Sequence, residues 1–464
     1  MTEHHASNFF ERSARAAADK DLHAKLANAT QRQFTGRVAI CKDLPDIDRF
    51  RTLGAAIRDD VLAHLDTYLK TFTDNLTAAG VYVHYAETAD AARTAIAEIA
   101  RKNNVRRIVK SKSMASEEID LNPALEQLGI EVTETDLGEY IVQIAGHKPG
   151  HLVTPAIHFS TADVAKLFRE KLAYDGPEDP TAMTKFAKKI LRDKFRRADM
   201  GISGVNLGVA NPGLIGICTN EGNGRYVTTR CKIYVALMGM ERLVPDMASA
   251  AVILKLLARF STGQRITQYT TFTHGPGHFD GPKEVHLVLL DNGRSEILKT
   301  KHWQVLRCIR CGSCVNACPV FNKICGHAYG GPYCGPIGAM VMPLLYGLDK
   351  YPELPKACTL CGLCQDVCPV RIPTTDVLLD FRNELVRTRR VPFFEPWAMR
   401  LAAFGMAHPT LYKLAQRLMP GILQPLSRDG WVKFLPGPSG GWTKVKDLPL
   451  PAKRSFLRSL EDKR

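Results

Sequence analysis

The sequence of 464 residues predicts an α/β fold with a mainly parallel sheet, followed by a cysteine-rich module and a basic tail. Two observations lead to this prediction. Between residues 80 and 297, short apolar runs alternate with stretches of helical periodicity, as in sheets whose parallel strands are joined by helices. Ten of the thirteen cysteines then lie between Cys308 and Cys368. The chain is therefore long enough for two or more domains with their own cores.

The first 79 residues predict a helical segment. Apolar residues recur every three or four positions from Phe50 to Leu76, which is the pattern of one long amphipathic helix. A helix of this kind buries its apolar face against a neighbour. We therefore expect residues 1–79 to pack on another part of the protein.

Residues 80–297 predict the α/β domain. The expected strands lie in VYVHYA at 81–86, RRIVK at 106–110 and IEVTET at 130–135, and around GVNLGVA, LIGICT, KIYVALMGM, RITQYTTF and EVHLVLLD. The expected helices lie in residues 88–104, 116–129, 162–173 and 181–199. This order of elements predicts a mainly parallel sheet with helices on both faces.

Residues 298–384 contain two copies of the pattern C-x₂-C-x₂-C-x₃-C-P. In this pattern three cysteines close on one 4Fe-4S cluster, while the fourth binds the other cluster. Structural zinc sites need only four ligands in paired halves and do not require a fourth cysteine followed by proline. The expected ligands are Cys308, Cys311, Cys314 and Cys368 for cluster 1, and Cys358, Cys361, Cys364 and Cys318 for cluster 2.

The cysteine-rich module is predicted to relay electrons. The 39 residues between Cys318 and Cys358 exceed a minimal ferredoxin hairpin and resemble the helical ferredoxin modules of succinate dehydrogenase iron–sulfur subunits. Every iron has a thiolate candidate, so no iron is left open for a substrate. Cys325 and Cys334 lack ferredoxin spacing, and we expect neither to bind a cluster.

Residues 385–464 predict a basic tail. Residues 381–464 hold 16 Lys and Arg against 6 Asp and Glu, in a chain of net charge +15. Such a tail suits an acidic partner, an anionic membrane surface or nucleic acid. No helix-turn-helix or RNA-reading motif is present, so nucleic acid is not expected. The tail aromatics Phe393, Phe394, Trp397, Trp431 and Trp442 need burial, and we expect the tail to dock on the chain's own domains or on a partner.

The sequence also predicts a compartment. The first residues are polar and charged and do not form a signal peptide, and thirteen cysteines without an export signal fit a reducing environment. The longest apolar runs fall short of the roughly 20 residues that span a bilayer. We expect a cytoplasmic protein, with peripheral contact at the inner membrane face left open.

A second type of site is predicted in the α/β domain. Lys110, Lys112 and Ser113 follow an expected strand and precede an expected helix, where backbone N–H groups and ammonium groups would suit an anion such as a carboxylate. The competing interpretation is that the serines cap the helix and the lysines are solvated. The remaining candidates are Asp136, beside Glu139, and the loop residues Asn220, Glu221 and Asn223. No residue is identified as catalytic.

Several long motifs give the chain a family resemblance. KSKSMASEEIDLN, ETDLGEYIVQIAGHKPGHLVTPAIH, ADMGISGVNLGVA, TNEGNGRYVTT and DNGRSEIL, together with both cysteine runs, resemble the lactate utilization protein B family over nearly the whole chain. The resemblance implies an α/β domain similar in fold to ribose-phosphate isomerases and CoA-transferases. The chain departs from the expected pattern in PGHL at 149–152, in TTRC at 228–231 and at Cys325 and Cys334, and none of these touches the eight cluster cysteines.

The resemblance also implies a function. Family members work with two companions, lactate utilization proteins A and C, in oxidising L-lactate to pyruvate. We therefore expect an iron–sulfur subunit that passes electrons through two 4Fe-4S clusters to an acceptor such as a quinone and does not catalyse the oxidation alone. The cysteine motifs also allow another hydroxy acid such as glycolate, or a regulatory protein that senses a carboxylate or redox state. No G-x-G-x-x-G or Walker motif follows a strand, so neither nicotinamide nor ATP is expected.

Overall fold

A computed structural model describes residues 8–277, 279–391, 394–437, 440–443, 446–452 and 456. Phe393 and the side chain of Trp442, two of the tail aromatics, lie outside this described part. The chain forms two compact units, Met1–Arg382 and Asn383–Arg464.

Four helices precede the sheet: α1 Phe9–Ala18, α2 Lys20–Lys42, α3 Ile47–Ala63 and α4 Leu65–Ala78. The expectation of one long helix from Phe50 to Leu76 is wrong, because the chain leaves helical geometry at His64. The two halves pack on different neighbours. Phe50 and Ile57 of α3 pack on the core of the cysteine-rich module, whereas Phe72 and Leu76 of α4 pack on the sheet.

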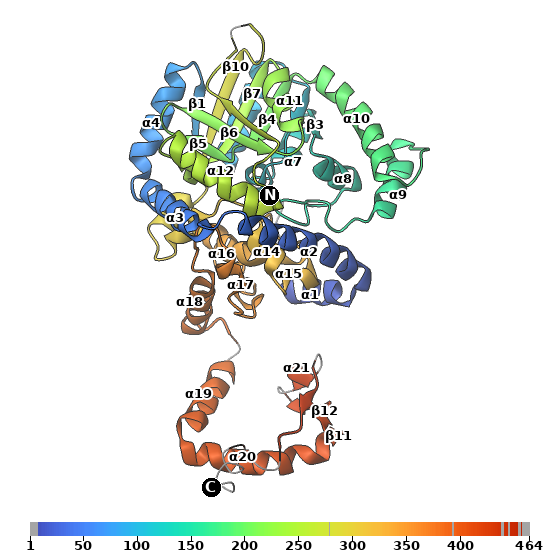
Figure 1. Ribbon diagram of the computed structural model, residues 1–464, viewed down its shortest axis with the longest axis vertical. Helices are drawn as coiled ribbons and strands as arrows, with labels where there is room; N and C mark the ends of the chain where they lie inside the picture. Colours follow the sequence, from blue (N-terminus) through green and yellow to red (C-terminus); the bar gives the residue numbers. More distant parts are fainter. Residues whose placement is uncertain are drawn as a thin grey trace. The chain divides into compact units, whose positions relative to one another are not determined.

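The main sheet has six parallel strands in the order β1-β10-β7-β4-β2-β3 (Figure 1). Their bounds are β1 Tyr82–Ala86, β2 Arg107–Lys110, β3 Glu131–Glu134, β4 Met200–Gly204, β7 Ile233–Gly239 and β10 Glu284–Leu290. The predicted parallel sheet is confirmed. β4 was not expected, because its sequence MGISG is rich in glycine. A side chain at Gly201 would collide with the carbonyl oxygen of Val227, so glycine there lets a helix pack closely on the strand.

The two faces of the main sheet are covered differently. Helices α5 Ala89–Lys102 and α7 Leu121–Glu126 cover one face. The other face is covered by α4 and by a second sheet of order β8-β5-β6-β9, rather than by helices alone as expected. The second sheet comprises β8 Leu243–Val244, β5 Leu207–Val209, β6 Leu214–Thr219 and β9 Tyr269–Thr273. The other helices of this part are α6 Met114–Glu118, α8 Leu137–Ala145, α9 Thr161–Leu172, α10 Pro180–Arg197, α11 Asn223–Arg230, α12 Met247–Thr262 and α13 Arg294–Leu298.

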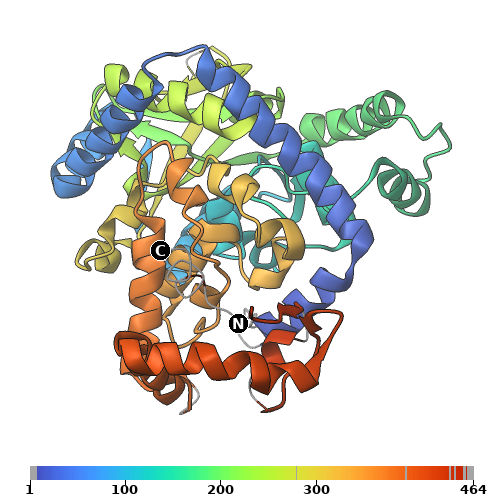
Figure 2. The same ribbon diagram turned by 60° about the horizontal axis from the view of Figure 1, so that its bottom comes forward.

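The cysteine-rich module is made of short helices. They are α14 Ser313–Ala317, α15 Phe321–Ile324, α16 Gly335–Tyr346, α17 Leu363–Asp366 and α18 Thr374–Arg387. Its core continues into α1, α2, α3 and α12, so the module does not have a core of its own. Figure 2 shows α2 crossing the face of the molecule beside the module.

The C-terminal unit contains α19 Phe394–Ala407, α20 Pro409–Leu423, α21 Gly440–Thr443 and the short strands β11 Ser427–Arg428, β12 Trp431–Val432 and β13 Leu448–Pro449. Many of its apolar side chains are exposed, including Trp397, Leu401, Phe404 and Ile422. Within the described ranges, no helix combines the length and the apolar character needed to cross a membrane.

Candidate functional site

The two cysteine motifs form matching turns. Arg310 and Gly312 adopt positive φ angles of 59° and 76°, and the equivalent Leu360 and Gly362 adopt 54° and 82°. The sulfur of Cys308 accepts a hydrogen bond from the Arg310 N–H at 3.4 Å, and the sulfur of Cys358 accepts one from the Leu360 N–H at 3.3 Å. The fourth cysteines are also bonded through sulfur, Cys318 to the Phe321 N–H at 3.5 Å and Cys368 to the Ile372 N–H at 3.4 Å. Each motif thus forms the same turn and donates backbone N–H groups to two of its four sulfurs.

Cysteines of the two motifs meet at one cavity. This small cavity is lined by five of them, Cys308, Cys311 and Cys314 of the first motif and Cys364 and Cys368 of the second. The thiol of Cys318 does not line this cavity. Burial raises its pKa to about 11, with backbone N–H groups opposing this and neighbouring Cys358 and Cys361 adding to it.

This donor set fits iron–sulfur clusters. Cys308, Cys311, Cys314 and Cys368 line a mostly apolar space together with side chains such as Ile337 and Met340. Cysteine thiolates with backbone N–H groups on their sulfurs, in an apolar surrounding, are the ligands that 4Fe-4S clusters use. The surplus cysteines lie elsewhere. Cys325 is buried with its sulfur 3.8 Å from the Gly150 carbonyl oxygen, and Cys334 is the first residue before α16.

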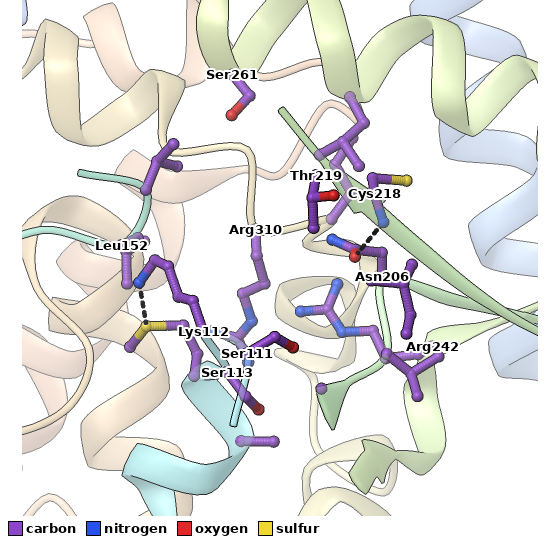
Figure 3. Close-up of a pocket in the computed structure, with 18 of the residues that line it drawn as sticks. Ser111, Lys112, Ser113, Leu152, Asn206, Cys218, Thr219, Arg242, Ser261 and Arg310 are labelled. Atoms are coloured by element: carbon purple, nitrogen blue, oxygen red, sulfur yellow. Dashed lines mark hydrogen bonds between the residues drawn. The ribbon is translucent and has the colours of Figure 1, made fainter. Parts of the chain in front are cut away.

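A larger pocket of about 350 Å³ opens at the carboxyl ends of the parallel strands β2, β3, β4 and β7 (Figure 3). This edge is where ligands bind in open α/β sheets, because loops diverge there and polar groups face outward. One wall comes from the cysteine-rich module, through Ile309, Arg310 and Tyr333. Ile309 and Arg310 are the two residues between Cys308 and Cys311, and they also line the cysteine cavity. The pocket and the cysteine cavity are therefore separated by the single turn of backbone between Cys308 and Cys311.

The structure brings six of the seven predicted substrate-site residues to this pocket: Lys112, Ser113, Asp136, Asn220, Glu221 and Asn223. Ser113 caps α6, accepting a hydrogen bond from the Ser116 N–H at 3.2 Å. Asp136 caps α8, accepting one from the Glu139 N–H. A Glu221 oxygen accepts one from the Leu137 N–H at 3.4 Å.

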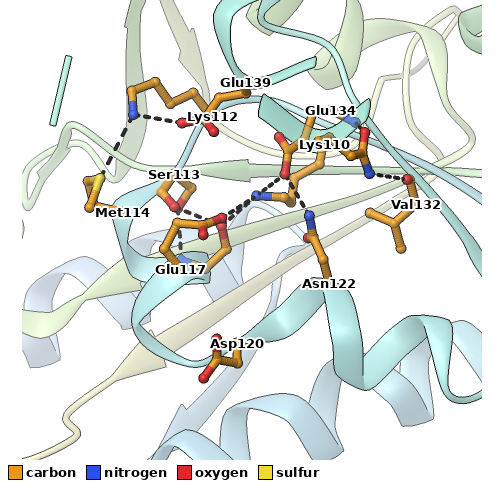
Figure 4. Close-up of polar contacts among 12 residues, drawn as sticks. Lys110, Lys112, Ser113, Met114, Glu117, Asp120, Asn122, Val132, Glu134 and Glu139 are labelled. Carbon is orange, nitrogen blue, oxygen red and sulfur yellow. Dashed lines mark hydrogen bonds and ion pairs between the residues drawn. The ribbon is translucent and has the colours of Figure 1, made fainter. Parts of the chain in front are cut away.

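Lys110 lies outside the pocket, and the interpretation of solvated lysines is wrong. Its side chain is only 1% exposed, and its ammonium group lies 2.7 Å from Glu134 and 3.7 Å from Glu117 (Figure 4). Lys112 is also mostly buried and lies 2.8 Å from Glu139. Burial alone would lower the pKa of both lysines, but their carboxylate partners raise it.

Several charged pocket residues were missed by sequence reasoning: Glu241, Arg242, Arg294 and Arg310. Arg294 forms a two-pronged pair with Glu118, with both N–O distances at 2.8 Å, and its third nitrogen lies 2.6 Å from Glu241. Arg242 follows β7 in the short helix η1 Met240–Arg242 and donates to the Cys308 carbonyl at 3.0 Å. Two signals were available: the position of Arg310 inside a cysteine motif, and the position of Arg294 inside DNGRSEIL, a motif used only for the family resemblance. Glu241 and Arg242 lie side by side after β7 and have no local pattern of their own.

Family models match three consecutive parts of the chain. A LUD domain matches residues 69–290, a 4Fe-4S dicluster domain matches residues 304–372, and the lactate utilisation protein B C-terminal family matches residues 387–464. A protein named lactate utilization protein B from Bacillus licheniformis is 42% identical over 98% of this chain and 97% of its own length. The chain belongs to the lactate utilization protein B family. Namesakes from Bacillus pumilus and Bacillus cytotoxicus are 42% and 43% identical over 97% of the chain, covering 96% and 95% of their own lengths.

Membership of the lactate utilization protein B family defines the cofactor content. The dicluster domain means that the chain carries two 4Fe-4S clusters, in agreement with its two cysteine motifs. A solved DUF162 family protein from Deinococcus radiodurans matches 49% of this chain and 98% of its own chain, at 13% identity and a TM-score of 0.28, which is too low to bear on the fold.

Proposed function

We propose that this lactate utilization protein B family member is the iron–sulfur electron-transfer subunit of a multi-protein system that oxidises L-lactate to pyruvate. The oxidation releases two electrons and two protons. Two 4Fe-4S clusters that accept one electron each match this electron count. The electrons then leave for an acceptor such as a quinone.

One observation carries the proposal. The pocket at the carboxyl end of the sheet and the cysteine cavity share the Cys308–Cys311 turn, since Ile309 and Arg310 line both. A ligand in the pocket would lie one backbone turn from cluster 1. This arrangement favours electron transfer between the pocket side and the clusters over a purely structural role for the clusters.

We also propose that the two clusters are bound in a crossed manner, with cluster 1 on Cys308, Cys311, Cys314 and Cys368 and cluster 2 on Cys358, Cys361, Cys364 and Cys318. The lining of the cysteine cavity and the position of the Cys318 thiol beside Cys358 and Cys361 support this assignment. Crossed ligands tie the two motifs into one folding unit.

The proposal includes partners. We propose that companion proteins A and C of the same system supply the chemistry that this chain lacks, and that the exposed apolar side chains of α19 and α20 serve contact with one of them. We further propose a cytoplasmic location and an α/β domain related in fold to ribose-phosphate isomerases and CoA-transferases, in line with its parallel sheet.

Cluster bleaching tests the proposal. The anaerobically purified chain is mixed with both companions and L-lactate, and its visible absorbance is followed. We expect bleaching with all three proteins and none when the chain is given L-lactate alone. Steady lactate oxidation by the isolated, cluster-loaded chain with an artificial acceptor would contradict the assignment of a relay role.

A further inference from the structure

We infer that the pocket at the carboxyl end of the main sheet binds a small 2-hydroxycarboxylate directly, with its carboxylate on the guanidinium of Arg310. The choice of ligand class rests on the proposed function. The site itself rests on charge, burial and position in this chain, and it assigns to Arg310 a role that the cysteine pattern does not require.

The pocket has a positive wall beside the clusters. Three guanidinium groups, those of Arg294, Arg242 and Arg310, share two carboxylates. Glu118 pairs with two nitrogens of Arg294. Glu241 is therefore the only one of the two carboxylates near all three guanidinium groups, at 2.6 Å from Arg294, 3.6 Å from Arg242 and 3.8 Å from Arg310. This wall therefore carries an excess of one positive charge, which a bound carboxylate would neutralise.

Arg310 is poised to bind an anion. Its side chain is 11% exposed, lies over the Tyr333 ring at 4.1 Å and extends into the pocket beside Arg242 (Figure 3). Among the described residues, its Nε and Nη1 atoms are buried without a hydrogen-bond partner. A buried guanidinium with unused N–H groups is costly unless an acceptor completes it, and a carboxylate oxygen is a charged acceptor for such an N–H group.

Other pocket residues supply hydrogen-bond acceptors, in contrast to the guanidinium donors of the positive wall. Asp136, Glu221 and Asn223 supply acceptor oxygens, and the Asn223 side-chain oxygen is buried without a partner within the described part of the chain. Acceptors of this kind suit a ligand hydroxyl, which donates a hydrogen bond. A pocket with a guanidinium wall and an acceptor wall thus suits a 2-hydroxycarboxylate better than a simple carboxylate.

The second cysteine motif argues against an alternative role for Arg310. In that alternative, Arg310 would bind no ligand, and its charge would only balance the negative charge of cluster 1. The equivalent position of the second motif is Leu360, with nearly the same backbone angle, 54° against 59°. The turn therefore forms without a cation, and the chain itself shows that leucine is compatible with it.

The test variant is Arg310→Leu, because it gives the first motif the residue that the second motif has at the equivalent position, Leu360. Binding of L-lactate to the anaerobic, cluster-loaded chain is measured by calorimetry, with propionate as the probe that lacks the hydroxyl and inorganic phosphate as a general anion. We expect saturable L-lactate binding, weaker propionate binding, and about a tenfold to hundredfold loss of L-lactate affinity in Arg310→Leu with all irons retained.

Two controls make the result decisive. Arg382 donates to the Cys358 carbonyl beside the second motif and does not line the pocket, so Arg382→Gln should leave lactate binding unchanged. Arg310→Lys keeps the charge. If Arg310→Leu loses iron, Arg310→Lys becomes the test variant, and it should retain part of the L-lactate affinity of the wild type. Absence of saturable lactate binding, equal affinity for phosphate and lactate, or an Arg310→Leu variant that changes only the cluster reduction potential would overturn the inference.

The same samples separate this inference from the proposed function. Lactate-driven cluster bleaching with the companions, in a chain that does not bind lactate, would overturn the inference alone. Lactate binding without any bleaching would support the pocket and contradict the electron-transfer proposal.

Discussion

Lys110 is a buried ion-pair residue that the sequence presents as a surface lysine. Its ammonium group lies between Glu134 and Glu117, and the Ser116 hydroxyl accepts a further hydrogen bond from it at 2.7 Å. Because the two carboxylates come from a neighbouring strand and from the helix that follows, spacing along the chain does not reveal the pairing. Ser113, in contrast, caps its helix as the competing interpretation proposed, since capping depends only on local sequence.

Removing this lysine tests the ion pair. Lys110→Met should lower the free energy of unfolding by about 3–5 kcal/mol, because it leaves buried carboxylates without their cation. Lys148 pairs with Asp120 at a similar distance, 2.8 Å, but is 62% exposed, so Lys148→Met should cost less than about 1 kcal/mol. Denaturant unfolding of both variants gives the comparison, and equal effects would contradict the account.

His151 provides a prediction about pH. Its Nδ1 accepts hydrogen bonds from the Val153 and Thr154 N–H groups at 3.0 and 3.1 Å, which requires the neutral ring. Burial, together with the charge of Lys112, lowers its pKa to about 3. The folded state therefore binds a proton less readily than the unfolded chain, and the contribution of the neutral ring is complete above pH 6.5 and is lost as the pH falls toward 3.

We expect the titration of His151 to lower the free energy of unfolding by about 2 kcal/mol between pH 6.5 and pH 5. In His151→Asn, the side-chain oxygen can accept the same N–H groups without titrating. The variant should therefore lose less stability than the wild type over this range in denaturant unfolding. Parallel pH profiles for the two proteins would show that His151 does not titrate as proposed.

At the scale of elements, packing partners explain the differences from the predicted fold. Periodicity predicts the helical character of residues 50–76 but not the break at His64, because the break arises where two helices turn toward different cores. The strands LIGICT and EVHLVLLD were predicted from their apolar runs and are present as β6 and β10. β4 was missed because its glycines serve close packing, Gly201 with Val227 of α11 and Gly204 with Ser113, and no local pattern shows these contacts.

Crossed binding of the clusters is testable at this scale. Cys318→Ala should damage cluster 2, on the second motif, while cluster 1 is better preserved. The matched control is Cys325→Gly combined with Cys334→Ala, since Cys325 has a positive φ of 57° that glycine tolerates. The control should retain about eight irons per chain. Loss of cluster 1 instead in Cys318→Ala, or loss of about four irons in a folded control, would show that the ligand assignment is wrong.

At the scale of the whole molecule, the order of helical segment, α/β domain, cysteine-rich module and basic tail could be predicted. The pocket between the α/β domain and the cysteine-rich module could not. The cysteine spacing alone predicted the two clusters, because ligand geometry is written into a short stretch of chain. The pocket draws on residues as distant as Lys112 and Arg310, which meet only when the module packs against the sheet. Polar loop residues such as Asn223 could be selected from the sequence, whereas Arg242 and Glu241 have no pattern that separates them from surface charges.

Because the chain forms two compact units, we expect removal of the second unit to abolish the reaction with the companions without removing the clusters. A chain ending at Arg390 keeps the whole first unit, Met1–Arg382, including all eight cluster cysteines. We expect it to fold with about eight irons and to lose lactate-driven bleaching with the companions, since α19 and α20 with their exposed apolar side chains are gone. Iron analysis and the bleaching assay measure the two outcomes. Loss of the clusters would instead show that the tail supports the first unit.

The most direct test of the account is an anaerobic titration of the complete system with L-lactate, followed by electron paramagnetic resonance of the clusters. Lactate oxidation yields two electrons, and the chain holds two clusters that each accept one. The account predicts that about one lactate per chain reduces both clusters when both companions are present and no acceptor is added. Pyruvate formation with both clusters remaining oxidised would contradict it.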